Sequence, residues 1–99
     1  MMNQTVLVGR VVDIIIKEDG ESTCVKLQVA VTRSYKNAKG EYETDIIPLV
    51  LFGSIAKNTM EYVKKGDLIG ARGRLECTDG DVHVLCDRIS YLSSKKDGE

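Results

Sequence analysis

The sequence predicts an all-β domain with one short helix, and three observations support this prediction. Most of the chain consists of short segments in which apolar residues, many of them β-branched, alternate with polar ones, as is typical of strands. One segment, residues 53–66, instead repeats apolar residues at helical spacing. Polar segments that contain glycine separate these stretches. The resulting order, β-β-β-α-β-β, is that of a five-stranded Greek-key barrel of the OB type, whose helix plugs one end.

The first strand is expected at Gln4–Ile16. Its apolar residues occupy both parities, so both of its faces should be partly covered. Gly9 lies inside this strand, and such a glycine often marks a bulge or a bend at a barrel corner. The polar segment Lys17–Ser22 is expected to turn the chain. The second strand, Val25–Thr32, shows the cleanest alternation of the chain and should bury one face.

A polar hairpin loop, Arg33–Glu41, leads into the third strand, Tyr42–Phe52. The apolar, β-branched part of this segment is too short for a self-contained helix and favours a buried strand. Ser54 is expected to cap the helix that follows, and Gly66 to end it in a left-handed conformation. The apolar stripe of the helix, spaced i, i+4 and i+7, comprises Ala56, Met60 and Val63.

The fourth and fifth strands are expected at Leu68–Cys77 and Val82–Leu92. The turn Thr78–Asp81 joins them, because Asp-Gly is a strong hairpin signal. Residues 1–92 are therefore predicted to form one OB-fold domain, and residues 93–99 a short polar tail. No apolar run approaches the roughly 20 residues that a membrane span requires, so no membrane association is expected.

The composition is that of an ordinary soluble domain, with 42% hydrophobic and 29% charged residues among 99. The N-terminus lacks the basic and apolar regions of a secretory signal. The three cysteines form no CxxC pair, which indicates reduced thiols in a cytoplasmic protein. A nucleic-acid binder is usually basic, whereas the net charge of this chain is −1. Any attraction of DNA must therefore come from local clusters of basic residues.

The sequence offers no catalytic or metal-binding constellation. With one histidine, no nucleophile motif and no Gly-rich phosphate loop, we expect no enzyme activity and no cofactor. Cys77, His83 and Cys86 lack the spacing of zinc ligands, and His83 and Cys86 fall on opposite faces of the fifth strand. No metal site is therefore predicted.

Several short motifs carry a resemblance to a known family: residues 6–10 (VLVGR), 35–41 (YKNAKGE), 50–53 (VLFG), 55–56 (IA), 61–67 (EYVKKGD) and 73–75 (GRL). In this order and spacing they resemble the bacterial single-stranded DNA-binding proteins over nearly the whole chain. The resemblance implies an OB-fold that coats single-stranded DNA without catalysis, usually as a homotetramer. It also implies a role in DNA replication, recombination or repair, in the cytoplasm and associated with the nucleoid.

The sequence departs from the family pattern at three places. Ile46 stands where the family commonly has a tryptophan or another large aromatic residue. The hairpin between the fourth and fifth strands shrinks to Thr78–Asp81. The family usually continues into a disordered tail with an acidic, aromatic tip that recruits repair enzymes, whereas this chain ends at Lys95–Glu99. The resemblance therefore identifies no replication or repair partners.

An alternative from a different class stays open. It is a protein-interaction OB module of the primosome type, in which contact with nucleic acid is incidental. The absent tail, the missing aromatic residue and the acidic pI favour this alternative. Binding of RNA or tRNA fits the fold as well, but lacks the resemblance.

Single strands offer flat bases and a charged backbone, so a binder needs exposed aromatic residues close to lysines or arginines. Tyr35 lies in the polar loop between Arg33 and Lys36, where nothing apolar requires it, and it matches a stacking position of the family. Phe52 ends the third strand, where the residues alone leave a core role and a stacking role equally open; the resemblance favours stacking. Tyr42 is a further candidate platform at the base of the loop.

Two groups of basic residues are candidates for phosphate contacts. The first group shares the loop and comprises Arg33, Lys36 and Lys39. Only Glu41 opposes them there. Arg72 and Arg74, at i and i+2, share one face of the fourth strand and can point into one groove. The predicted DNA-binding residues are therefore Tyr35, Phe52, Arg33, Lys36, Arg72, Arg74 and Tyr42. Tyr62 and Tyr91 are expected to have packing roles.

The first strand also offers a surface for self-association. An open OB sheet leaves the edge Thr5–Arg10 without partners, and this edge contains no proline and no charge before Arg10. A dimer along this strand is therefore predicted, and the resemblance adds a homotetramer made of two dimers. Tyr91 and the Ile14–Ile16 patch are candidates for the second contact.

Overall fold

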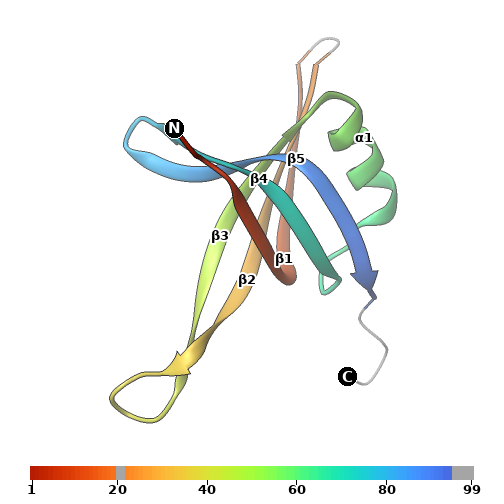
Figure 1. The fold of residues 1–99 in the computed structure, drawn as a ribbon. Helices are drawn as coiled ribbons and strands as arrows, with labels where there is room; N and C mark the ends of the chain where they lie inside the picture. The colour runs from red at the N-terminus through yellow and green to blue at the C-terminus, as the bar shows by residue number, and fades with distance from the viewer. Residues whose placement is uncertain (20–21, 95–99) are drawn as a thin grey trace.

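The computed structural model, which describes residues 1–19 and 22–94, is a closed barrel of five strands with one helix (Figure 1). The strands adjoin one another in the order β1-β2-β3-β5-β4, and helix α1 (Gly53–Tyr62) lies between β3 and β4 in the sequence. The strand bounds are β1 Thr5–Asp19, β2 Ser22–Lys36, β3 Tyr42–Phe52, β4 Leu68–Thr78 and β5 Asp81–Ser93. The predicted fold class and element order are confirmed.

A bulge in β1 explains why its apolar residues occupy both parities. Val11 pairs with Val29 of β2, but the next pair along the ladder is Asp13 with Gln28, so Val12 is an extra residue. An extra residue reverses the facing of every side chain beyond it. Val11 is buried before the bulge, and Ile14 packs against the same core after it.

Gly9 lies where the backbone of β1 passes close to that of β2, two residues before Val11, at which the bulge begins. A Cβ atom at this position would lie 2.5 Å from the carbonyl oxygen of Ala30. The glycine is therefore required by a close approach of two backbones, and the bulge that such a glycine often marks lies further along the strand.

The long hairpin of β2 and β3 extends beyond the barrel at the end away from α1 (Figure 1). β2 continues to Lys36, so the first four residues of the predicted loop, Arg33–Lys36, belong to a strand. β1 also continues, through Lys17–Asp19, into the segment that was predicted to turn. The rest of that turn includes residues 20 and 21, which lie outside the described residues.

Helix α1 packs against β2, β3 and β5 and buries Ala56 and Thr59. The prediction that Ser54 caps the helix is wrong, because the helix begins at Gly53 and Phe52 is the N-cap residue, with no side-chain capping bond. Gly66 does adopt the predicted left-handed conformation, with φ at 93°, but it does not end the helix, which stops at Tyr62 with Val63 as its C-cap. Its N–H then donates to the carbonyl oxygen of Val11 (2.7 Å), which fixes the chain entering β4 beside β1.

The core is aliphatic and lies inside the barrel. Its buried residues are Val11, Val25, Leu27, Val29, Leu49, Leu51, Ala56, Val63, Ile69, Ala71, Val84 and Cys86. Parallel pairing of β3 with β5 closes the barrel through two residue pairs, Leu49 with Val84 and Val50 with Leu85. Within the described ranges, no helix has the length and hydropathy that crossing a membrane requires.

Closure of the barrel corrects one premise of the assembly prediction. The segment Thr5–Arg10 is not an unpaired edge of an open sheet, because it pairs along its whole length with Leu68–Gly73 of β4. Its pairing with β2 starts only at Arg10. Among the described residues, the second edge of residues 5–9 therefore has no strand partner.

Candidate nucleic-acid interface

Every aromatic side chain of this protein lies at the surface. The chain has four tyrosines and one phenylalanine. Their exposed fractions are 64% for Tyr35, 56% for Tyr42, 55% for Phe52, 68% for Tyr62 and 49% for Tyr91. Aromatic rings contribute strongly to cores when they are buried. The aliphatic core makes no use of them, so all five remain available for contacts outside the chain.

Two of these rings lie on the outer face of β3. The even-numbered residues of this strand face outward, with Tyr42 at the hairpin end, Ile46 in the middle and Phe52 at the helix end, all of them exposed. Tyr42 and Phe52 are ten positions apart, which corresponds to about 33 Å along an extended strand. The outer face of β3 is thus a long track with an aromatic residue at each end.

The structure removes the core role that the sequence left open for Phe52. The ring lies opposite Cys24 of β2, on the outside of the barrel. It borders a hollow that is also lined by Ser22, Thr23, Gly53, Ser54 and Lys57. The core position at this end of the strand belongs to Leu51, which is fully buried.

Tyr35 lies near the loop end of the β2–β3 hairpin. Thr32 pairs with Thr44 and Lys36 pairs with Tyr42, so the β2 residues between them, including Tyr35, face a single residue of β3. Next to Tyr35, the ammonium group of Lys36 lies 5.8 Å from the centre of the Tyr42 ring, within the range of a cation–π contact. The structure thus brings Lys36 and Tyr42 together, and Tyr35 precedes Lys36 in the same strand.

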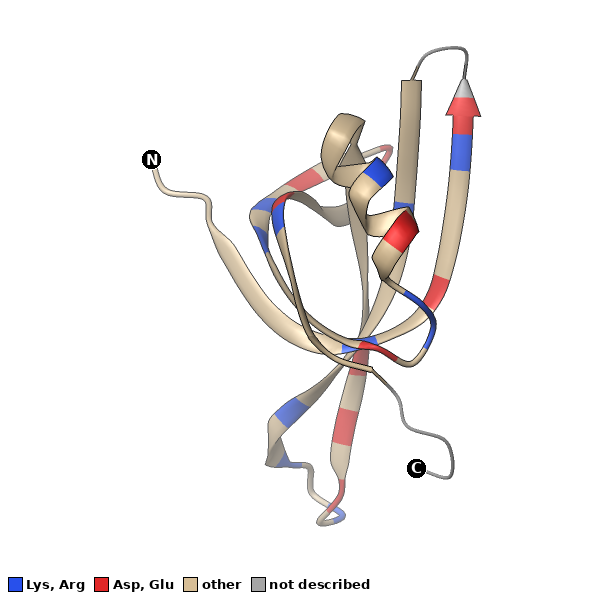
Figure 2. Cartoon of the chain, turned by 90° about the vertical axis from the view of Figure 1, so that its right-hand side faces the viewer, with Lys and Arg blue, Asp and Glu red and all other residues tan. Residues whose placement is uncertain are grey.

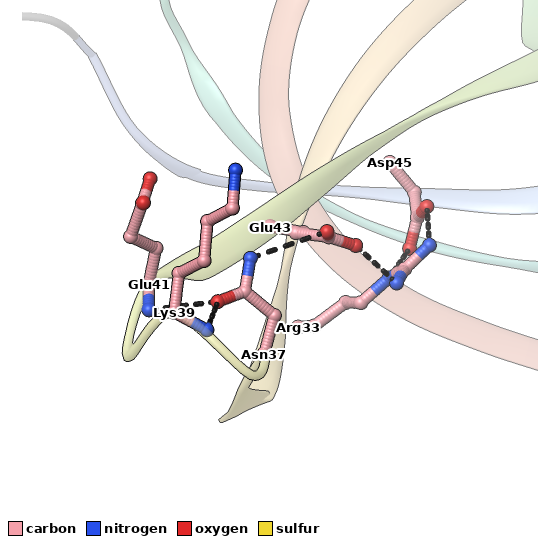
Figure 3. A network of polar contacts seen from close by, with 6 residues as sticks. All are labelled: Arg33, Asn37, Lys39, Glu41, Glu43 and Asp45. Atoms are coloured by element: carbon pink, nitrogen blue, oxygen red, sulfur yellow. Dashed lines mark hydrogen bonds and ion pairs between the residues drawn. The ribbon is translucent and has the colours of Figure 1, made fainter.

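Asn37 orders the loop at the tip of this hairpin (Figure 3). Its side-chain oxygen accepts hydrogen bonds from the backbone N–H groups of Lys39 (2.9 Å) and Glu41 (3.0 Å). Its own backbone N–H donates to the carbonyl oxygen of Glu41 (2.8 Å). Gly40, with φ at 78°, allows the chain to reverse. The loop is therefore held by hydrogen bonds within it.

Arg33 has partners that the sequence reasoning missed. Its guanidinium donates from Nε and Nη2 to the two oxygens of Asp45 (3.0 and 2.9 Å) and from Nη1 to Glu43 (2.5 Å), as Figure 3 shows. Hydrogen bonding to Asp45, and its charge, raise the pKa of Arg33, while the same bond lowers the pKa of Asp45. The expectation that only Glu41 opposes the basic residues here is wrong. Figure 2 shows basic residues on one strand of this hairpin opposite acidic residues on the other.

Arg72 and Arg74 share one groove, as predicted. Both line a hollow beside the N-terminal residues Met2–Gln4, together with Gly73 and Asp87. Each arginine also has a carboxylate partner: Arg72 Nε donates to Asp87 Oδ1 (2.8 Å), and Arg74 Nε donates to Glu76 Oε2 (3.2 Å). Of the four predicted cationic ligands, only Lys36 has no carboxylate within ion-pair distance in the described part of the chain.

Strand register connects Arg74 with the outer face of β3. Leu85 of β5 pairs both with Val50 of β3 and with Arg74 of β4, and Val50 pairs in turn with Lys26 of β2. Residues paired across neighbouring strands project from the same face. Arg74 and Lys26 therefore flank the β3 track from opposite sides. Lys26 occupies a polar position in the alternating pattern of β2, but its neighbours on other strands follow only from the register.

Other chemistry is sparse in this molecule. Within residues 1–19 and 22–94, no group of three or more His, Cys, Asp or Glu side chains is arranged to hold a metal ion. His83 lies instead beside Glu76, with 3.5 Å between Nε2 and Oε1. Burial raises the pKa of the Cys86 thiol to about 12, which keeps this cysteine protonated and unreactive near neutral pH.

A closed OB barrel with exposed aromatic residues and flanking basic side chains has the features of a protein that binds single-stranded nucleic acid. Comparison with known proteins agrees. The Single-strand binding protein family matches residues 2–81. Single-stranded DNA-binding protein 1 of Streptococcus pyogenes is 34% identical, over 96% of this chain and 80% of that protein. A protein of the same name from Clostridium acetobutylicum is 33% identical, over 97% and 98%. The chain belongs to the single-strand binding protein family.

Solved structures agree on the fold. The second single-stranded DNA-binding protein of Mycobacterium smegmatis superposes with a TM-score of 0.76, covering 92% of this chain and 89% of that chain at 17% identity. The small single-stranded DNA-binding protein of Streptomyces coelicolor gives a TM-score of 0.74, covering 93% and 95% at 18% identity. At such identities the likeness concerns the fold alone.

Proposed function

We propose that this protein binds single-stranded DNA without catalysis and with little sequence preference. The observation that carries this proposal is the exposure of Tyr35, Tyr42 and Phe52 along the β2–β3 hairpin and the outer face of β3. Every base has a flat π-face, so bases stack on aromatic side chains whatever their sequence. Membership of the single-strand binding protein family and the names of the relatives support the same function.

The bases stack on Tyr35 and Phe52, and Tyr42, at the hairpin end of the β3 track, is a third platform. Phosphates are held by Lys36, Arg72 and Arg74. Arg72 and Arg74 are already bonded to carboxylates. To bind a phosphate, each arginine must either contact both groups or break its bond to the carboxylate. We therefore expect each arginine to contribute less to DNA binding than an unpaired cation.

The alternative of a protein-interaction module is not favoured, because the relatives are named for binding single-stranded DNA. We propose that the protein acts in DNA replication, recombination or repair, in the cytoplasm at the nucleoid. Its protein partners in these processes are not identified by anything in the site.

We further propose that the protein assembles into a homotetramer through dimers along Thr5–Arg10. The second edge of residues 5–9 supports this, since no strand pairs with it among the described residues. Val6 and Val8, whose side chains lie beside this edge, are exposed. Unpaired strand edges readily recruit a further strand, and a second copy offers a symmetric partner.

A titration with oligo(dT), duplex DNA and RNA of the same length, at two salt concentrations, tests the function. We expect oligo(dT) to bind much more tightly than duplex DNA, since stacking requires unpaired bases. Equal affinity for duplex and single strands would indicate general attraction to phosphates. Absence of binding to all three nucleic acids would favour the protein-interaction alternative.

A further inference from the structure

The loop end of the β2–β3 hairpin contains an irregularity that is supported by a network of polar contacts. Between the pairs Thr32–Thr44 and Lys36–Tyr42, β2 has three residues and β3 has only Glu43. Extra residues of this kind bend a strand and re-aim side chains, often beside binding sites. Tyr35 is one of the three, and its ring is largely exposed.

Arg33, also in the irregular segment, bonds it to the regular sheet. The planar fork of the guanidinium engages both oxygens of Asp45, which pairs with Val31 in the ladder next to the irregularity. A third nitrogen engages Glu43, directly opposite the extra residues. A bidentate fork fixes the orientation of its partner as well as its distance, which a point charge does not.

The same network reaches the loop. The second oxygen of Glu43 accepts a hydrogen bond from the side-chain nitrogen of Asn37 (3.3 Å). Asn37 in turn holds the backbone of the loop through Lys39 and Glu41. One continuous chain of contacts therefore links the barrel, the irregular segment of β2 and the loop (Figure 3).

We propose that Arg33, Asp45 and Glu43 are positioning residues that hold Tyr35 in place for stacking, and that Arg33 does not act as a phosphate ligand. This inference rests on the proposed function. Two carboxylates beside a path of phosphates oppose binding by their charge, while their bonds to Arg33 fix the hairpin. Removing a carboxylate strengthens DNA binding if its negative charge matters most, and weakens DNA binding if its bonds to Arg33 matter most. Experiment can therefore separate the two effects.

The central variant is Asp45→Asn, measured in the full chain by titration with oligo(dT) over a range of salt. If the bonds position Tyr35, the variant binds at least about five-fold more weakly, the lower end of the loss of one stacked base. The slope of affinity against salt stays unchanged. If Asp45 merely withholds Arg33 from phosphates, the variant binds more tightly and with a steeper slope, and the inference is overturned.

Glu41→Gln is the matched control, because it removes the same charge from the same hairpin. Among the described residues, the side chain of Glu41 makes no hydrogen bond or ion pair, and only its backbone contacts Asn37. This variant is expected to bind as tightly as the unmodified protein, or slightly more tightly. A loss equal to that of Asp45→Asn would mean that charge alone is responsible, and would overturn the inference.

Arg33→Lys provides a second variant, which keeps the charge but loses the fork. A positioning role predicts a loss similar to that of Asp45→Asn, and a phosphate ligand predicts affinity close to that of the unmodified protein. In a double-mutant cycle, Tyr35→Ala should cost less in the Asp45→Asn background than alone, since the residues act together. Additive losses would show that Asp45 does not act through Tyr35.

Amide hydrogen exchange measured without DNA tests the inference independently of DNA binding. Asp45→Asn should speed exchange in residues 35–42, whereas Glu41→Gln should not. Unchanged exchange overturns the inference even if the protein binds DNA. Failure of the unmodified protein to bind oligo(dT) overturns the proposed function instead, and leaves the exchange result to decide whether the network orders the hairpin.

Discussion

At the scale of single residues, the side chains that form the core are clearly separate from the aromatic side chains at the surface. The core consists of Val, Leu, Ile, Ala and Cys side chains, and none of the five aromatic rings belongs to it. Replacing an exposed ring should therefore change binding more than stability. The predictions for Tyr35 and Phe52 both depend on this separation.

Tyr35→Ala should weaken binding of single-stranded DNA by about 1–3 kcal/mol, the usual cost of one lost stacking platform. Its melting temperature should stay close to that of the unmodified protein, because the ring is exposed. Fluorescence titration with oligo(dT) measures the loss. Tyr62→Ala is the matched control, since this ring is equally exposed but lies on α1, where it borders a hollow with Ile89 and Tyr91 of β5. Unchanged affinity of a folded Tyr35→Ala variant would remove Tyr35 from the site.

Phe52→Ala should also weaken binding, while costing less stability than its neighbour Leu51→Ala. Leu51 is fully buried, and truncation of such a leucine costs about 2–5 kcal/mol. Phe52 points to the other side of the strand and is only half-covered. Urea unfolding and DNA titration of both variants compare the two roles. A large loss of stability with intact binding would assign Phe52 to packing.

At the scale of elements, backbone contacts between strands impose requirements that single side chains do not reveal. Gly9→Ala should destabilise the protein by about 1–3 kcal/mol, the range for an overpacked core, because the added methyl group meets the backbone of Ala30. Gly70→Ala on β4 is the control, since the nearest atom to its new Cβ would be 3.8 Å away. Urea unfolding of both variants measures the difference. Equal losses would show that the barrel relaxes at Gly9.

The strand elements were predictable to different degrees for physical reasons. β3 was predicted at its observed bounds, because its β-branched run lies between a polar loop and a glycine. The bulge at Val12 left a trace in the sequence, the presence of apolar residues at both parities of β1, whose cause appears only in the pairing with β2. Gly9 could be predicted to mark a special position, because a glycine inside a strand usually accompanies a bulge, a bend or a close approach of two backbones.

The electrostatics of the site could not be predicted in the same way. Arg33 and Asp45 are 12 positions apart, so their contact depends on the register of β2 against β3 and on the irregularity between them. Counting charges within the loop therefore missed both acidic partners of Arg33. The pairing of Arg72 with Asp87 likewise depends on how β4 lies against β5. Exposure of the aromatic residues was easier to anticipate, because a polar loop offers no core.

At the scale of the whole molecule, the balance of charge should make binding only weakly dependent on salt. The net charge is −1, and three of the predicted cationic ligands are bonded to carboxylates. On single strands, each neutralised phosphate contributes about −0.7 to the slope of log K against log salt. We expect a slope equivalent to about two to four contacts per subunit. Titrations with oligo(dT) between low and high salt measure this slope. A slope equivalent to about six contacts per subunit would reveal a basic surface that the structure has not indicated.

Assembly is the largest-scale expectation, and it depends on a small surface. The second edge of residues 5–9 and the exposed side chains of Val6 and Val8 offer a second copy both backbone groups and apolar area. One strand of DNA could then contact several subunits, and such multivalency raises affinity without any new contact per subunit. Light scattering at micromolar concentration should give four times the 10.9 kDa mass of the chain.

Val8→Glu should abolish this assembly, because it places a charge on each side of a symmetric contact. Val82→Glu on β5 is the matched control, since both valines are 52% exposed but Val82 lies near the tip of the β4–β5 hairpin. Both variants should keep the circular dichroism spectrum of the barrel. The dissociated Val8→Glu variant should bind a short oligo(dT) as the unmodified protein does, and lose affinity only for long strands that reach several subunits. A 10.9 kDa monomer in the unmodified protein would contradict both the pairing of the first strands and the multivalent mode of binding.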